Sequence, residues 1–211
     1  MQDFLQNISL IKAKEEFLNE FASSKGEYFN LFSICGVDAS EIAHSKILAT
    51  ILNPYSPHGQ RGLYLRAFLN PLSGDKFFQD FNCEQSRVFT EFSFDKGRID
   101  ILIRDDAGKV IIIENKIFAG DQSSQLIRYS SFAQERYGTD FRIIYLTRNG
   151  DDASDDSAKG VYYIRLSWSV DIVAWLNECH ALSTDVPSVR EFLKQYIAPL
   201  VSRSDALILN K

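Results

Sequence analysis

Apolar residues recur at helical spacing through the first quarter of the chain. Between residues 4 and 22 they alternate with charged residues, which indicates one or two amphipathic helices. These apolar residues are Phe4, Ile8, Leu10, Ile11, Phe17, Leu18 and Phe21. Asp38 and Glu41 have the spacing of a capping box, and apolar residues between 42 and 52 follow them. The sequence therefore predicts a further helix that begins near Asp38 and ends before Pro54.

Beyond Arg87 the spacing of apolar residues changes from helical to strand-like. Three such runs, Val88–Phe94, Ile99–Arg104 and Val110–Lys116, are separated by short connections that contain glycine. The second connection, Asp-Asp-Ala-Gly at residues 105–108, is typical of a tight turn. Three consecutive strands joined in this way predict an antiparallel meander.

A helix and a further strand are predicted after the meander. Residues 121–137 have helical spacing and end at Gly138, and residues 141–147 form another strand-like run. A strand–helix–strand crossover attached to a three-strand meander favours an α/β fold with a mixed sheet flanked by helices. The other elements expected on the same grounds are a loop over 53–62, a helix over 63–69, a mobile acidic loop over 149–160, a strand over 161–166, and helices over about 169–179 and 187–202.

The composition is that of an ordinary globular protein. Of the 211 residues, 45% are hydrophobic and 24% are charged. A chain of this length suffices for a well-buried core. We expect a single domain over residues 1–211, with a helical N-terminal extension over 1–70 and C-terminal helices over 169–211. The first residues do not resemble a secretory signal, and apolar runs such as Val110–Ile113 are far too short to span a bilayer.

The cysteine content bears on the cellular compartment, and the net charge bears on the kind of partner. Cys35, Cys83 and Cys179 are odd in number and widely scattered, which favours free thiols in a reducing cytoplasm over a disulfide framework or a zinc cluster. A net charge of −5 argues against a protein that coats nucleic acid, but not against one that binds it in a local cleft. We therefore expect a cytoplasmic protein without membrane association, and nucleic acid stays open as a partner.

Two acids and a lysine interrupt the apolar strands of the meander. Glu114 and Lys116 lie two residues apart and project from the same face of the third strand. Asp100 interrupts the second strand, and pairing residue 100 with residue 114 centres the connection on residue 107, inside the expected turn. The two carboxylates are therefore expected opposite or diagonal to each other, where a buried charge is costly without a partner.

The two carboxylates need a positive partner, because close carboxylates repel each other and one lysine does not neutralise both. Carboxylate and carbonyl oxygens, together with water, suit Mg²⁺ or Mn²⁺. Such a cation makes a bound water more acidic and offsets charge that builds on a phosphoryl oxygen. Lys116 would orient or help to deprotonate this water, or stabilise the transition state, and the sequence does not choose among these roles. The alternative is a purely structural ion network on the sheet.

An ordered set of short motifs surrounds these residues. They are Gly97-Arg-Ile-Asp100, Glu114-Asn-Lys116, Gln125-Leu-Ile-Arg-Tyr129 and, upstream, Asn30-Leu-Phe32 and Glu41-Ile-Ala-His-Ser45. With these motifs, most of the chain resembles the PD-(D/E)XK nuclease superfamily, which has the restriction-endonuclease-like fold. Within it, the chain is similar to a family of bacterial and phage proteins with helical extensions. The proline of the superfamily name is absent, because Ile99 precedes Asp100, but that position carries no catalytic group.

The resemblance implies a metal-dependent nuclease, with Mg²⁺ as cofactor and Mn²⁺ as a substitute. Asp100, Glu114 and Lys116 would be its catalytic core, and the two acids would be metal ligands. The resemblance also implies that Glu41 joins the site as a further catalytic acid and metal ligand. It places Gln125 near the metal or the scissile phosphate, in a supporting catalytic role.

Basic and aromatic side chains near these motifs are the expected contacts to nucleic acid. They are Arg98, Arg128, Tyr129, Lys46 and His44. Simpler interpretations stay open. In these, Glu41 serves only its capping box and His44 is a structural histidine. Gln125 and Tyr129 share one helix face, and their simpler role is to pack on the sheet. Glu91 either approaches the site from the first strand or is an acid on the surface of an edge strand.

Two functions of different class are compatible with these residues. The first is a Mg²⁺-dependent nuclease that hydrolyses phosphodiester bonds in DNA, with RNA as another substrate that the catalytic residues allow. The second is a non-catalytic nucleic-acid-binding or assembly module on a nuclease-derived fold, which the acidic pI of 5.3 favours modestly. A homodimer is one expected arrangement, because many relatives of this fold work as dimers.

Overall fold

The structure is a computed structural model that describes the backbone of residues 2–208. The chain divides into two compact units, Met1–Gly36 and Val37–Lys211. The helices between residues 37 and 70, which we expected to belong to an N-terminal extension, are thus part of the same unit as the sheet. Among the described residues, no helix combines the length and the apolar character needed to cross a bilayer.

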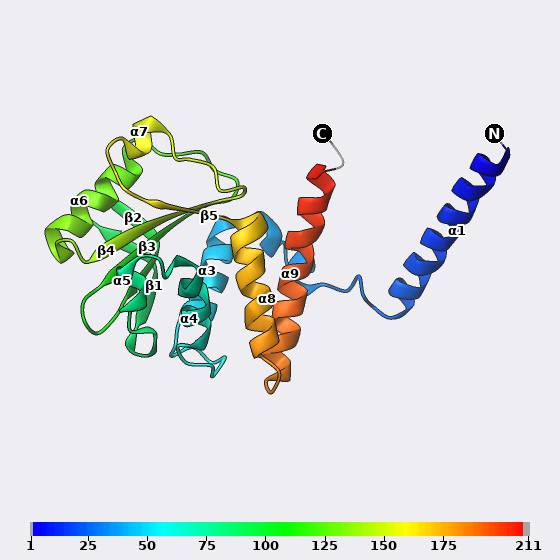
Figure 1. The fold of residues 1–211 in the computed structure, drawn as a ribbon, viewed down its shortest axis with the longest axis horizontal. Helices are drawn as coiled ribbons and strands as arrows, with labels where there is room; N and C mark the ends of the chain where they lie inside the picture. Colours follow the sequence, from blue (N-terminus) through cyan, green and yellow to red (C-terminus); the bar gives the residue numbers. More distant parts are fainter. Residues whose placement is uncertain (1, 209–211) are drawn as a thin grey trace. The chain divides into compact units, whose positions relative to one another are not determined.

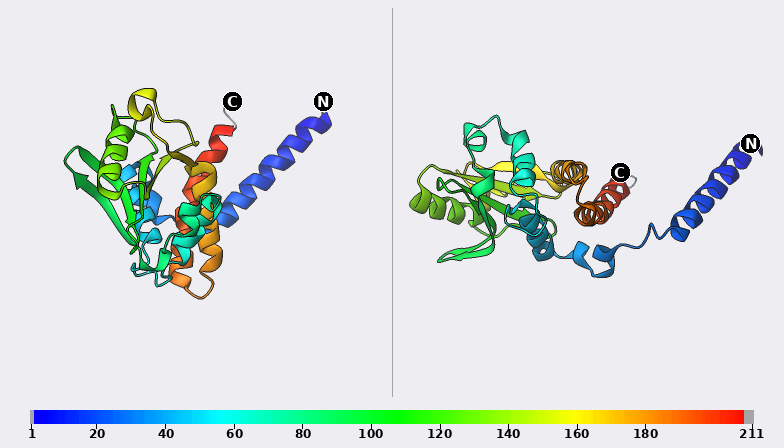
Figure 2. Two further views of the ribbon diagram at one scale, coloured as in Figure 1. Left: turned by 60° about the vertical axis from the view of Figure 1, so that its left-hand side comes forward. Right: turned by 90° about the horizontal axis from the view of Figure 1, so that it is seen from below.

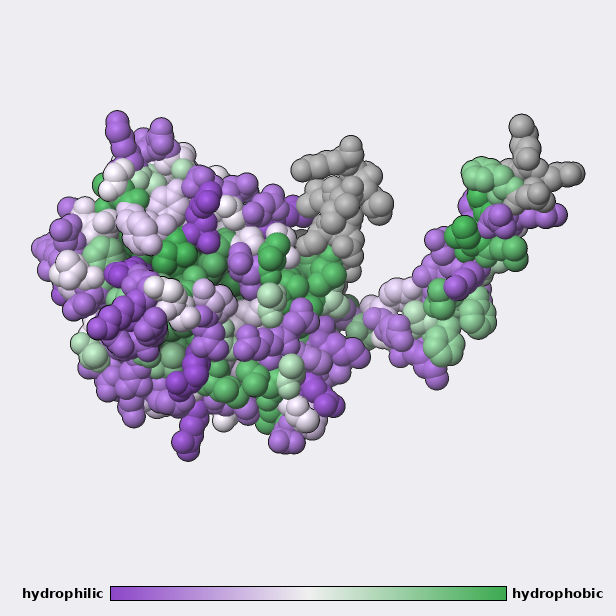
Figure 3. All heavy atoms as spheres, viewed as in Figure 1, coloured by the Kyte–Doolittle hydropathy of each residue, from purple (hydrophilic) through white to green (hydrophobic). Residues whose placement is uncertain are grey.

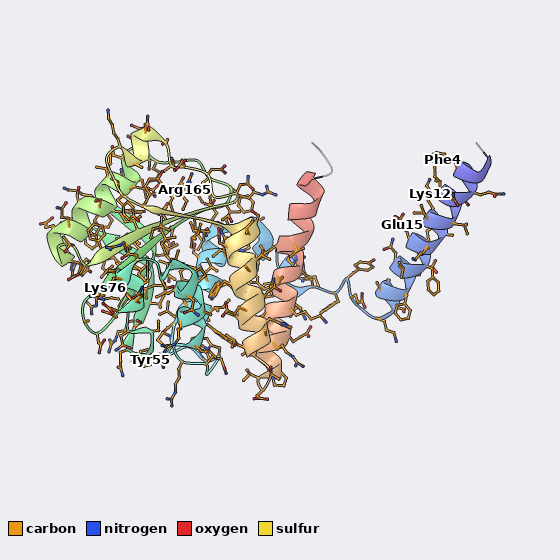
Figure 4. The ribbon with its side chains drawn as sticks, in the orientation of Figure 1. Phe4, Lys12, Glu15, Tyr55, Lys76 and Arg165 are labelled. Carbon is orange, nitrogen blue, oxygen red and sulfur yellow. The ribbon has the colours of Figure 1, made fainter. Side chains whose placement is uncertain are left out.

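The first unit is helical. α1 is one continuous helix over Gln2–Ser24, and α2 is a single turn over Leu31–Ile34. The large apolar side chains that the structure describes along α1 are exposed, and they form the apolar surface that Figure 3 shows on this unit. Figure 4 shows Phe4, Lys12 and Glu15 projecting from the same helix.

The second unit is built on a five-stranded mixed sheet with the order β1-β2-β3-β4-β5 (Figure 1). The strands are β1 (Arg87–Phe94), β2 (Gly97–Arg104), β3 (Val110–Lys116), β4 (Phe141–Thr147) and β5 (Ile164–Ser167). β1, β2 and β3 are antiparallel, whereas β4 pairs parallel to β3 and β5 parallel to β4. The predicted meander, crossover and mixed α/β sheet are therefore confirmed.

Helices flank this sheet, with α6 against β2, β3 and β4 and α3 against β1, β2 and β3 (Figure 2). The helices are α3 (Glu41–Leu52), α4 (Leu63–Leu69), α5 (Lys76–Gln79), α6 (Gln125–Tyr137), α7 (Asp155–Ala158), α8 (Val173–Leu182) and α9 (Pro187–Ile208), with the 3₁₀ turns η1 (Val37–Ala39), η2 (Asn70–Leu72) and η3 (Cys83–Gln85) and the π-helical segment η4 (Trp168–Ile172). The end of the expected C-terminal helical region, residues 209–211, lies outside the described residues.

Side-chain alternation along β3 separates two layers of the core. Ile112 belongs to the layer beneath α6, where it clusters with Leu126 and Tyr129. The side chain of Asn115, three residues further on, points to the other face and reaches Ser45 of α3. Residues of β3 that share the phase of Ile112 therefore face α6, and the others face α3.

The start of α6 differs from the sequence prediction. The helix begins at Gln125 rather than at Asp121. The carboxylate of Asp121 accepts hydrogen bonds from the hydroxyl of Tyr145 and from the amide of Ser154. Asp121 therefore anchors the loop before α6 instead of starting the helix.

The acidic segment 149–160 is not a loop throughout, as the sequence predicted, because it contains α7. Ser154 caps this turn by accepting a hydrogen bond from the amide of Ser157. Asp155 and Asp156 occupy the first turn, where negative charge is favourable. The following strand, β5, consequently begins at residue 164 rather than 161.

Candidate active site

The ladder between β2 and β3 sets Asp100 opposite Glu114. Ile101 pairs with Ile113, and the next step in that register is the pair 100–114, as the turn at 105–108 predicts. Beyond the Ile101–Ile113 pair, the side chain of Asp100 joins the two strands, because the backbone amide of Asn115 donates a hydrogen bond to Oδ2 of Asp100 at 2.8 Å. The two acids therefore stand together where the backbone ladder ends.

Glu114 is the buried centre of a hydrogen-bond network. Its side chain is 1% exposed, and Nζ of Lys116 lies 3.0 Å from its Oε1. The same oxygen accepts a hydrogen bond from Nε2 of Gln125 at 2.6 Å. The other oxygen, Oε2, lies 2.8 Å from the hydroxyl of Tyr129, and the same hydroxyl lies 2.6 Å from the carbonyl oxygen of Arg98. The α6 side chains Gln125 and Tyr129 thus hold Glu114 in a single orientation.

The pKa values of both carboxylates of the pair are raised above their ordinary values. Burial, followed by the charge of Asp100, raises the pKa of Glu114 to about 7, although Lys116 and Tyr129 act to lower it. Burial also raises the pKa of Asp100, against the lowering effects of the Asn115 amide and Lys116. Two adjacent buried acids with one lysine leave an excess of negative charge, which a bound cation would neutralise.

Glu41 begins α3, but not in the capping box that the sequence predicted. The N-cap is Ser40, whose hydroxyl accepts a hydrogen bond from the amide of Ala43 at 3.2 Å, so the prediction of Asp38 as the cap is wrong. Oε1 of Glu41 instead accepts hydrogen bonds from the amides of residues 117, 118 and 119, at 2.7, 2.5 and 2.8 Å. Its carboxylate therefore fastens the segment that follows β3.

The charge of Glu41 is stabilised where it lies. Burial acts to raise the pKa of Glu41, but the amides of residues 117–119 and the nearby Lys116 outweigh burial and hold it below the ordinary value. Glu41 also lines one cavity of about 290 Å³ together with the carboxylate pair. Other residues that line this cavity are Lys116, Gln125, Gly97, Arg98 and Arg128.

Two arginines lie at the wall of this cavity. Arg98 is 59% exposed, and its Nε forms an ion pair of 2.8 Å with Oε2 of Glu91. Arg128 donates from Nη1 to the carbonyl of Ser123. Its Nε is buried and has no hydrogen-bond partner in the part of the chain that the structure describes. Arg98 and Arg128 therefore bring positive charge to the wall of the cavity.

Three of the residues that we expected to contact nucleic acid are either buried or outside the cavity. Tyr129 is 1% exposed, and its hydroxyl is used inside the Glu114 network. His44 is 3% exposed, and its Nδ1 lies 2.6 Å from the hydroxyl of Tyr196. Lys46 is exposed on α3 and does not line the cavity. The positions of Tyr129 and His44 suit internal support rather than contact with a ligand.

Glu91 approaches the site, which was one of its two expected placements. Thr90 pairs with Ile101 and Phe92 with Ile99, so the β1–β2 register sets Glu91 opposite Asp100. Glu91 has a φ of 52°, a left-handed conformation that is strained for a non-glycine residue in a strand. Its side chain lines the cavity. Counting the register of the first hairpin is the sequence signal that identifies this residue.

Several side chains that line the cavity carry oxygen atoms of the kind that bind a divalent cation. Among the described residues, no group of three or more His, Cys, Asp or Glu side chains is placed to hold a metal ion. Mg²⁺, however, is commonly bound by one or two carboxylates and several waters, and Asp100 and Glu114 supply such a pair. Oε1 of Gln125 is a further hard oxygen in the cavity wall, buried and unpartnered among the residues described. The residues present therefore fit a hard divalent cation.

We expect Tyr129→Phe to lower kcat of any reaction at this site by roughly tenfold, the lower end of what supporting residues contribute. The substitution removes the hydroxyl that lies between Glu114 and the carbonyl of Arg98. It should also lower the free energy of unfolding by about 1–3 kcal/mol, because buried polar partners lose their hydrogen bond. Steady-state kinetics and urea unfolding measure the two effects.

Tyr64→Phe is the matched control for this substitution. Tyr64 is fully buried and its hydroxyl lies 2.6 Å from Oγ of Ser183, but neither residue lines the cavity. Tyr64→Phe should therefore lower stability without changing kcat. Equal kinetic effects of the two substitutions would show that Tyr129 has no special role in holding Glu114.

The comparisons with known proteins identify the family of this chain. The model of the PD-(D/E)XK nuclease superfamily matches residues 29–198. No curated protein matches the chain. Among solved structures, a repair endonuclease from Pyrococcus abyssi is 18% identical, with 47% of this chain and 43% of that chain covered and a TM-score of 0.29. A complex of EndoMS with double-stranded DNA is 22% identical, with coverage of 38% and 32% and a TM-score of 0.25.

This chain spans less than half of the length of the two solved structures. The family match, by contrast, covers most of the chain and includes α3, the whole sheet and most of α9. It also includes the residues that line the cavity around Asp100 and Glu114. The chain therefore belongs to the PD-(D/E)XK nuclease superfamily, with the restriction-endonuclease-like fold.

Proposed function

We propose that this protein is a metal-dependent nuclease that hydrolyses phosphodiester bonds in DNA. The observation that carries the proposal is the convergence of Asp100, Glu114 and Lys116 on one cavity at the end of β3. The side chains of Glu114 and Lys116 are only 1% and 9% exposed. Charges buried this deeply are costly unless they have a function or a full set of partners. The excess of acid over base in this set favours a cation site over a structural ion network.

Asp100 and Glu114 are the residues that would hold the cation, Mg²⁺ or Mn²⁺, with Gln125 in support. When bound, the cation supplies Lewis acidity toward a phosphoryl oxygen and makes water a better nucleophile. Glu41 would act mainly by fixing the segment 117–119, because one of its oxygens is already taken by three amides. Its contribution as a direct metal ligand, which the family resemblance implies, rests on its other oxygen.

Lys116 is suited to orient the attacking water and to stabilise negative charge in the transition state. Its Nζ lies 3.0 Å from Glu114 and is nearly buried, so the ammonium is held in one place rather than in bulk solvent. A fixed charge in a water-poor site stabilises a developing charge more strongly than a mobile one does. Of the roles left open by the sequence, electrostatic stabilisation and orientation of water agree best with this ion pair.

Arg98 and Arg128 are the residues that we assign to the phosphate backbone. Among the described residues they are the arginines that line the cavity, and guanidinium groups bind phosphate oxygens well. DNA is the substrate that the family resemblance implies, and phosphate contacts alone do not exclude RNA. A homodimer and a cytoplasmic location, the latter expected from three free cysteines, stay predictions.

A cleavage assay on the purified full chain tests the proposal. Supercoiled, linear duplex and single-stranded DNA and a matched single-stranded RNA are each incubated with Mg²⁺, Mn²⁺ or EDTA. We expect DNA cleavage with either metal and none with EDTA. Cleavage of RNA alone would overturn the substrate assignment. Salt-sensitive DNA binding without cleavage in any metal would favour the alternative, a non-catalytic binding or assembly module.

A further inference from the structure

Asn115 lies between Glu114 and Lys116 in the chain but projects from the opposite face of β3. Glu114 faces α6, where Gln125 and Tyr129 bind it, whereas the side chain of Asn115 faces α3. It is 1% exposed and does not reach the solvent. A buried amide of this kind is costly unless each of its polar atoms is bonded.

The side chain of Asn115 is bonded on both its donor and its acceptor atom. Nδ2 donates to Oγ of Ser45 at 2.9 Å and to the carbonyl of Glu41 at 3.4 Å, both on α3. Oδ1 accepts a hydrogen bond from Nε1 of Trp168 at 2.8 Å. Trp168 opens η4 and packs edge-on against His44. One amide thus joins the end of β3 to two other elements.

The backbone of the same residue contacts the carboxylate pair. The amide of Asn115 donates to Oδ2 of Asp100 at 2.8 Å, at the point where β2 and β3 stop pairing. The position of Asp100 is therefore linked to the position of the Asn115 backbone. That backbone is in turn held by Ser45 and Trp168 through the Asn115 side chain.

Lys116 is fastened on both sides by the N-terminal part of α3. Before it, Asn115 bonds to Ser45 and to the Glu41 carbonyl; after it, the Glu41 carboxylate binds the amides of residues 117–119. The catalytic lysine thus sits between two anchors on one helix. Displacement of either anchor would move Lys116 relative to Glu114.

We propose that Asn115 is a positioning residue, which sets the separation of Asp100, Glu114 and Lys116 by locking the end of β3 to α3 and η4. The inference rests on the proposed function, because it assigns Asn115 to the same cation site. Both polar atoms of the Asn115 side chain are already bonded within the fold, so it acts through the amide that holds Asp100 and through the neighbouring Lys116. The sequence motif Glu-Asn-Lys therefore contains a functional residue at its middle position.

The test measures both Mn²⁺ affinity by calorimetry and kcat for DNA cleavage in the full chain. Asn115→Ala should weaken Mn²⁺ binding and lower kcat by about 10–100-fold each, as loss of a supporting residue typically does. KM for DNA should not change. Trp168→Phe keeps an aromatic side chain, although a smaller one, and removes the indole N–H, so it should cause a smaller change of the same kind. The double variant should be no worse than Asn115→Ala alone, because both changes break one linkage.

Ser183→Ala is the control for loss of a buried hydrogen bond outside the site, since Ser183 is fully buried and bonds to Tyr64. It should leave Mn²⁺ affinity and kcat unchanged. Wild-type Mn²⁺ affinity in folded Asn115→Ala, or additive effects in the double variant, would overturn the inference. If the wild type binds Mn²⁺ but does not cleave, the proposed function fails, and weaker Mn²⁺ binding by Asn115→Ala still supports the positioning role. A wild type that neither binds Mn²⁺ nor cleaves overturns both.

Discussion

Lys116→Ala is expected to lower kcat for DNA cleavage by about 10²–10³-fold or more, the range for loss of one fixed electrostatic donor. The ammonium lies 3.0 Å from Glu114 in a nearly buried position, so solvent does not readily replace it. The pKa of Glu114, already about 7, should rise further without this partner, which weakens the carboxylate as a cation ligand. Single-turnover cleavage at saturating Mg²⁺ measures the loss.

Lys116→Arg and Lys159→Ala separate the site effect from loss of charge in general. Arginine keeps a positive charge but presents a planar group in place of a compact ammonium, so we expect partial activity. Lys159 is exposed at the end of α7 and does not line the cavity, so Lys159→Ala should cleave like the wild type. Cleavage by folded Lys116→Ala within a few-fold of the wild type would contradict the assigned role.

Asp100→Asn is expected to lower the rate of metal-dependent cleavage by on the order of 10³-fold. This loss corresponds to the several kcal/mol that a bound cation contributes to the reaction. Asparagine has nearly the same shape, and its carbonyl oxygen is still able to accept the hydrogen bond from the Asn115 amide. The substitution therefore removes charge with little change in packing. Binding of DNA in EDTA should be retained or strengthened, because one acid near the phosphate is lost.

Cleavage with Mg²⁺ and fluorescence anisotropy with labelled DNA in EDTA distinguish the two effects of Asp100→Asn. Asp106→Asn serves as the control, because Asp106 lies in the exposed β2–β3 turn and bonds to Asn82. It should affect neither measurement. Loss of both binding and cleavage in Asp100→Asn would indicate a disrupted fold or a binding role for this acid, and full cleavage would remove it from the cation site.

The strands and their register were predictable from the sequence because they depend on local chemistry. The alternation of apolar residues sets the strands, and the Asp-Asp-Ala-Gly turn at 105–108 sets the register that brings residue 100 opposite residue 114. β3 has the predicted bounds, Val110–Lys116. The same counting applied to the first hairpin also places Glu91 beside Asp100.

The features that the sequence did not reveal depend on contacts between distant segments. The sequence predicts that a helix begins at Asp121. The carboxylate of Asp121 instead accepts hydrogen bonds from Tyr145 and Ser154, which lie 24 and 33 residues away. No role for Asn115 follows from its place between two charged residues, because its partners Ser45 and Trp168 lie 70 and 53 residues away. Propensity and spacing carry no information about such pairs, so these roles emerge only from the tertiary structure.

The burial of a polar side chain was also not predictable from its type. His44 and Tyr129 have side chains that often contact nucleic acid, and both belong to the motifs of the resemblance. In the structure they are 3% and 1% exposed, and they support the interior instead. The two arginines at the wall of the cavity, Arg98 and Arg128, agree with the prediction in their placement, although their contact with phosphate stays a prediction.

The most direct test of the central claim is restoration of cleavage by a metal. The purified full chain is stripped with EDTA, dialysed and incubated with supercoiled plasmid, and Mg²⁺ is then titrated back for the wild type and for Lys116→Ala. The proposed site predicts no cleavage before addition, saturable cleavage by the wild type after it, and almost none by the variant. Cleavage that persists without metal, or that is equal in the wild type and in Lys116→Ala, would contradict it.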